Sequence, residues 1–181
     1  MWGTPVSGKS TLSTALKEEK PFINSYYGGL GEQEFTKTVS IENKPMQLII
    51  HKLPGQDEYE YHILKLFQQA EINIGIFVFS VSSAELNCVM VRCKEISKAR
   101  KLKHFHLILI GNKVDNQDRK IGYEEAKNFA DTIDAIYFET SAHDYTGVQD
   151  LLNCMVSLVD VSGVSPPPRS IKSARFNCKE A

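Results

Sequence analysis

The first residues whose types and spacing suggest a chemical function lie at the start of the chain. Gly3, Gly8, Lys9 and Ser10 fit the pattern G-x-x-x-x-G-K-S of a phosphate-binding loop. Backbone N–H groups of such a loop surround phosphates, and the helix predicted from Ser10 to Glu19 would add its positive dipole end. A glycine-rich turn without this role is the alternative. The predicted phosphate site comprises Gly3, Ser7, Gly8, Lys9, Ser10 and Thr11, with the Ser10 hydroxyl also a magnesium ligand.

A second group of residues suits a purine base. Asn112, Lys113 and Asp115 form an N-K-x-D pattern directly after an apolar run. A carboxylate placed like Asp115 can accept hydrogen bonds from the ring N–H and the amino group of guanine, which adenine does not offer in that arrangement. Asn112 would brace the loops, and the Lys113 stem would cover the base. Alone, this pattern is also compatible with an ordinary polar turn.

A third motif, from Glu139 to Ala142, follows the last short apolar segment. Backbone N–H groups near Ser141 and Ala142 could reach the guanine oxygen. All three motifs occur in this order, each close to a predicted strand. The sequence therefore predicts a guanine nucleotide site.

Strands and helices that alternate along the chain would position these motifs. Two nearly continuous apolar runs indicate strands buried on both faces, and two alternating segments indicate an antiparallel hairpin with a turn at Asn43 and Lys44. The pattern predicts an α/β fold whose mostly parallel sheet has helices on both faces and binds ligands at the carboxyl ends of its strands. The predicted strands are 34–42, 46–52, 75–81, 105–110 and 135–139, and the further helices are 57–70, 84–100, 123–133 and 148–159.

Length and composition favour one domain, 1–160, and a flexible proline-containing tail, 161–181. With 21 basic and 22 acidic residues the net charge is −1, which argues against a nucleic-acid partner. The four cysteines have no zinc-ligand spacing, which indicates a reduced, cytoplasmic protein.

Only Met1 and Trp2 precede Gly3, so we expect most of the strand that leads into the phosphate loop to be missing. That strand would be central to the sheet. A truncated product or incomplete sequence is the favoured explanation, and a chain that folds as it stands is the alternative.

From Gly3 to Asp160 the sequence resembles the Ras superfamily of small GTPases, and the segments 54–59, 78–83 and 123–127 are most similar to its Rheb branch. The resemblance implies the P-loop NTPase fold and a GDP/GTP signalling switch. It also implies effectors, exchange factors and GTPase-activating proteins as partners. In this family's pattern, Gly55 contacts the terminal phosphate, Gln56 is the catalytic residue that positions the attacking water, and Phe22 packs against the base.

Three positions depart from the family pattern. Lys52 replaces an aspartate that supports magnesium, Gly29 replaces a magnesium-binding threonine, and Pro5 brings a ring without an N–H into the phosphate loop. These changes put Mg²⁺ binding in question and predict slow hydrolysis, with the Lys52 ammonium neutralising phosphate charge in part. The alternative function is a pseudo-GTPase that acts only as an interaction module.

Cys178 is the fourth residue from the end of the chain, the position of a prenylated cysteine. Lipidation there would give a weak attachment to the cytoplasmic face of a membrane. A terminal cysteine without that modification is the alternative.

Overall fold

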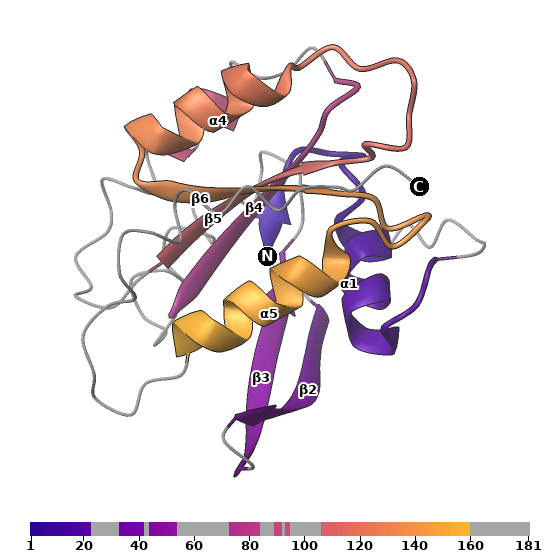
Figure 1. The fold of residues 1–181 in the computed structure, drawn as a ribbon, viewed down its shortest axis with the longest axis vertical. Helices are drawn as coiled ribbons and strands as arrows, with labels where there is room; N and C mark the ends of the chain where they lie inside the picture. The colour runs from indigo at the N-terminus through magenta and orange to yellow at the C-terminus, as the bar shows by residue number, and fades with distance from the viewer. Residues whose placement is uncertain are drawn as a thin grey trace.

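The computed structural model of the chain describes residues 1–22, 33–41, 44–53, 73–83, 89–91, 93–94 and 106–159 (Figure 1). The predicted helix 57–70 lies outside these residues, whereas 89–91 and 93–94, inside the predicted helix 84–100, are helical. None of the helices in these ranges is long and apolar enough to cross a membrane. The elements are β1 (Trp2–Gly3), α1 (Lys9–Glu18), β2 (Gln33–Ile41), β3 (Lys44–Lys52), β4 (Ile74–Ser80), β5 (His106–Asn112), α4 (Tyr123–Thr132), β6 (Ala135–Thr140) and α5 (Val148–Val159).

Four strands form a parallel sheet in the order β1-β4-β5-β6, and β2 and β3 form an antiparallel ribbon. The predicted α/β fold with a mostly parallel sheet is confirmed. In β4 and in β5, every residue but the first is buried, as expected for strands covered on both faces. The predicted turn was one residue too late, because Lys44 already pairs with Ile41 as part of β3.

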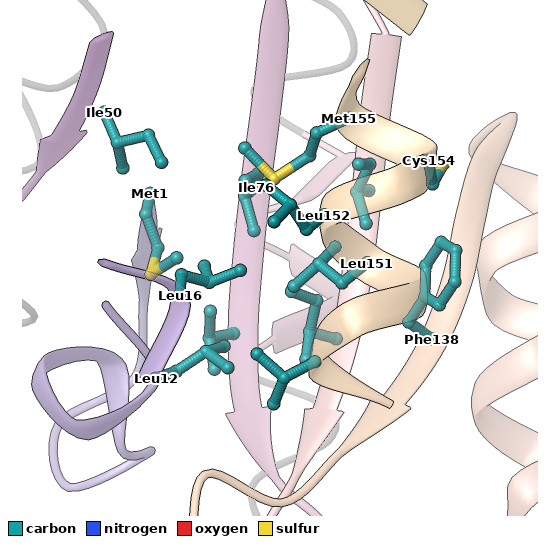
Figure 2. Close-up of a cluster of buried hydrophobic side chains, with 14 of the residues drawn as sticks. Met1, Leu12, Leu16, Ile50, Ile76, Phe138, Leu151, Leu152, Cys154 and Met155 are labelled. Atoms are coloured by element: carbon teal, nitrogen blue, oxygen red, sulfur yellow. The ribbon is translucent and has the colours of Figure 1, made fainter. Parts of the chain in front are cut away.

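Helices cover both faces of the sheet, and the side chains of β4 alternate between them. Phe77 and Phe79 belong to the core under α4, whereas Ile76 and Val78 belong to the core under α1 and α5. Figure 1 shows α4 on one side of the sheet and α1 and α5 on the other. In Figure 2, Leu12 and Leu16 of α1 and Leu151 and Leu152 of α5 lie around Ile76. The sheet is therefore the middle of three layers.

β1 is only two residues long, and Met1 joins the ribbon to the parallel sheet. The amino group of Met1 donates to the carbonyl of His51 at 2.6 Å, and the N–H of Leu53 donates to the carbonyl of Met1 at 2.8 Å. Trp2 contacts Phe77 edge to face, with ring centroids 4.4 Å apart. This arrangement brings the carboxyl end of β3 next to the loop that follows β1.

Candidate nucleotide-binding site

The loop between β1 and α1 is folded around the side chain of Lys9. Its ammonium group donates to the carbonyls of Gly3 at 3.1 Å and Thr4 at 2.6 Å, and to the hydroxyl of Ser7 at 3.4 Å. Gly8 caps α1 without a side-chain hydrogen bond, and the first turn of α1 carries no acidic residue. The positive end of the α1 dipole therefore adds to the charge of Lys9, which suits a phosphate group.

Asn112 connects the phosphate loop to the end of β6. Its side-chain amide donates to the carbonyl of Ser7 at 2.9 Å, and its side-chain oxygen accepts from the hydroxyl of Thr140 at 3.0 Å. Asn112 is fully enclosed, with 1% of its surface exposed. Gly8 has a φ of +88°, and a Cβ atom there would lie 2.4 Å from the amide nitrogen of Asn112, so only glycine allows this approach. The bracing predicted for Asn112 is observed as these two hydrogen bonds.

The residues predicted to recognise guanine lie at the same edge of the sheet. Since the four strands are parallel, their carboxyl ends meet there, where β5 ends at Asn112 and β6 ends at Thr140. Lys113 has a φ of +66° and turns the chain after β5, and Asp115 follows as an exposed residue. The N–H of Phe22 donates to the carbonyl of Ala142 at 2.8 Å, and this hydrogen bond holds Phe22 beside the loop after β6.

Ser141 and Ala142 differ in what their backbone groups can offer a base. The N–H of Ser141 donates to the carbonyl of Thr146 at 2.9 Å. The Ser141 hydroxyl accepts from the N–H groups of His143 at 3.1 Å and Asp144 at 3.3 Å. Ser141 thus shapes the loop, and the N–H of Ala142 is the better candidate for the guanine oxygen.

One network beside the base loop was missed by sequence reasoning. The two terminal guanidinium nitrogens of Arg119 each donate to the carboxylate of Glu139 at 2.8 Å, and the hydroxyl of Tyr137 donates to the same carboxylate at 2.9 Å. The hydrogen bonds to Glu139 raise the pKa of Arg119, whereas burial is the main cause of the raised pKa of Tyr137. The pair ties the loop after β5 to the end of β6. Glu139 was recognised as part of a motif, but no local pattern indicated a partner twenty positions earlier.

Lys52 occupies the position where magnesium was in question. Its ammonium nitrogen lies 3.2 Å from the hydroxyl oxygen of Ser10, and Lys52 exposes only 3% of its surface. This burial lowers the pKa of Lys52 from its ordinary value.

The fit of this position to Mg²⁺ can be tested on the geometry around Ser10. Magnesium binds oxygen ligands at about 2 Å, so an ion on the Ser10 hydroxyl would lie within about 5 Å of the Lys52 nitrogen. The Lys52 ammonium brings a positive charge to this position and has no lone pair, so it opposes a cation there and supplies no ligand to it. The described residues at Ser10 therefore do not fit a magnesium ion.

Of the remaining predicted positions, Pro5 lies within the described residues and the others lie outside them. Pro5 is exposed at the lip of the phosphate loop, and Val6 after it has a φ of +57°. The residues predicted to act at the site or to carry a lipid that lie outside the described residues are Gly29, Gly55, Gln56 and Cys178.

Comparisons with known proteins agree with this geometry. Residues 1–160 match the model of the Ras family. The GTP-binding protein Rheb homolog of Drosophila melanogaster is 27% identical over 172 residues, which cover 94% of this chain and 92% of that protein. The GTP-binding protein Rheb of Homo sapiens is 30% identical over 152 residues, covering 82% and 80%.

A relative from another branch is as similar as these. The GTP-binding protein YPT1 of Saccharomyces cerevisiae is 31% identical over 157 residues, covering 86% of this chain and 74% of that protein. The similarity to Rheb is confirmed, although these identities do not separate the Rheb branch from the Ypt1 branch. The family match spans the parallel sheet, the phosphate loop and the base loops alike, and the chain belongs to the Ras family.

Proposed function

We propose that this protein is a guanine-nucleotide-binding switch that hydrolyses GTP to GDP. One observation carries the proposal: Asn112 donates to Ser7 of the phosphate loop and accepts from Thr140, the last residue of β6 before the base loop. A single buried side chain thereby joins the sites that would hold the two ends of a nucleotide. The similar proteins Rheb and YPT1 are themselves named GTP-binding proteins.

Each part of the nucleotide has a group to bind it in this proposal. The ammonium of Lys9 and the first turn of α1 would bind the phosphates, since both carry positive charge. Asp115 would accept the ring N–H and the amino group of guanine, and the N–H of Ala142 would donate to its oxygen. Phe22 and the stem of Lys113 would cover the faces of the base.

Hydrolysis would use residues of the segment after β3. Water oriented by Gln56 would attack the terminal phosphorus, the bond to the bridging oxygen would break, and GDP and phosphate would leave. Gly55 would contact the terminal phosphate. Pro5 offers that phosphate no N–H, so we expect hydrolysis to be slow.

Membership of the Ras family indicates the general classes of partner. Proteins of the Ras family bind guanine nucleotides, typically with Mg²⁺. Regulators control them, and effectors bind to them. For this chain we infer an exchange factor, a GTPase-activating protein and an effector. We further infer a cytoplasmic protein that a lipid on Cys178 would attach weakly to the membrane face.

The proposed hydrolysis is tested by phosphate release from the full chain loaded with GTP. We expect one phosphate per protein, with the rate falling at least about tenfold in Gln56→Leu, which keeps the side-chain size but cannot orient water. Lys9→Ala should lose nucleotide binding and phosphate release. Lys17→Ala, on the far end of the same helix, is the control and should behave as wild type. Equal phosphate release by Lys9→Ala and wild type would contradict the proposal.

A further inference from the structure

The position of Lys52 is set by the main chain. β3 ends at Lys52, and the hydrogen bonds of Met1 with His51 and Leu53 hold the residues on either side of it. The Lys52 side chain is buried, and its nitrogen meets the Ser10 hydroxyl at 3.2 Å. Ser10 stands in the first turn of α1, next to Lys9. Two buried ammonium groups thus lie at the positive end of one helix.

The Ser10 hydroxyl has a defined task in proteins with this loop. The serine or threonine of the loop and an aspartate hold a Mg²⁺ ion, and that ion neutralises charge on the nucleotide phosphates. An ammonium group has only donors and no lone pair, so Lys52 cannot act as a metal ligand. Its charge would instead oppose a cation bound to Ser10.

We propose that the Lys52 ammonium supplies the charge that a metal ion supplies elsewhere, so that this chain binds metal-free guanosine di- or triphosphate. The inference rests on the proposed nucleotide function and deepens it. Lysine is a suitable group, because its compact charge and three donors bind phosphate oxygens directly. With Lys9 it gives the phosphates two cationic contacts at the N-terminus of α1.

The test is titration of the full chain with fluorescent GDP, once with millimolar MgCl₂ and once with excess EDTA. Wild type is expected to change its Kd by less than about threefold between the two conditions. Lys52→Met keeps the aliphatic stem and removes the charge, and should bind at least about tenfold more weakly in EDTA. Lys37→Met is the matched control, since Lys37 is also a buried lysine, in the neighbouring β2, but donates to Glu19. It should bind as wild type does.

Each result decides between the inference and the function on which it rests. A wild-type affinity that falls tenfold or more in EDTA would overturn the inference and leave guanine binding intact. Equal affinities of Lys52→Met and wild type in EDTA would overturn the role of Lys52. Absence of wild-type binding in both conditions would overturn the proposed function, and the inference with it.

A second measurement on the wild-type protein does not depend on how the variants fold. Mn²⁺ is added to the GDP-loaded protein, and the free ion is followed by its EPR signal. We expect the signal of aqueous Mn²⁺ to match that of buffer with the same amount of added ion. Loss of that signal in proportion to the GDP-loaded protein would show a metal site and overturn the inference.

Discussion

Val6, at the lip of the phosphate loop, has a main-chain conformation that a branched side chain rarely adopts. Its φ is +57°, in the left-handed region, and 71% of its surface is exposed. A β-branched residue held there costs about 1–3 kcal/mol, and an exposed side chain gains little packing to offset it. The hydrogen bonds from Lys9 to the carbonyls of Gly3 and Thr4 hold the loop in place. Local strain is therefore maintained by the loop as a whole.

Replacing this residue by glycine should stabilise the protein. We expect Val6→Gly to raise the free energy of unfolding by about 1 kcal/mol, because the relieved strain exceeds the added entropy of the unfolded chain. Urea denaturation followed by circular dichroism measures this change. Val91→Gly is the control: Val91 is also exposed but helical, and glycine there should lower the free energy of unfolding by roughly half a kcal/mol. A loss of stability in Val6→Gly would show that the loop is not strained.

At the scale of elements, the base loops depend on links between separate strands. The loop after β5 and the end of β6 are joined by the two hydrogen bonds between Arg119 and Glu139. The side chains of Arg119 and Glu139 expose 33% and 21% of their surface, so both are partly buried. Tyr137 adds a third hydrogen bond to the carboxylate. These contacts fix the start of the segment that ends in Ala142.

The strength of this link can be measured by a double-mutant cycle with Arg119→Ala and Glu139→Ala. We expect a coupling free energy of about 1–2 kcal/mol, because the pair is bidentate and partly buried. Lys127 and Asp131 provide the comparison, as an ion pair one turn apart on α4 with Asp131 half exposed. Their coupling should be about 0.3–0.5 kcal/mol. A coupling for Arg119 and Glu139 no larger than that of the α4 pair would contradict the structural role.

The sequence predicted these elements well where the pattern was local. The apolar runs of β4 and β5 and the helices α1, α4 and α5 were found to within about two residues, since periodicity and burial are properties of one segment. Lys52 and Arg119 were visible as residue types, but their contacts with Ser10 and Glu139 join distant parts of the chain. The hydrogen bond from the Ser141 N–H to the carbonyl of Thr146 could not be predicted either, because it depends on the conformation of the loop after β6.

For the molecule as a whole, a layered fold brings the site residues together. The core under α4 and the core under α1 and α5 hold the parallel sheet between them. Gly3, Asn112 and Thr140, the last residues of β1, β5 and β6, therefore lie at the same edge of the sheet, where the strands have their carboxyl ends. Lys52 reaches that edge from β3 through the hydrogen bonds of Met1. Phosphate recognition, base recognition and charge neutralisation are thus properties of the assembled sheet and not of one motif.

The central claim is that this edge binds a guanine nucleotide, and competition binding tests it most directly. Fluorescent GDP bound to the full chain is displaced with unlabelled GDP or ADP. We predict that GDP competes at least about 100-fold better than ADP, since a site built to accept hydrogen bonds from guanine leaves its carboxylate unpaired with adenine. Asp115→Asn should weaken GDP binding at least about tenfold, while Asp118→Asn in the same loop should not. Equal competition by ADP, or GDP binding unchanged in Asp115→Asn, would contradict the account.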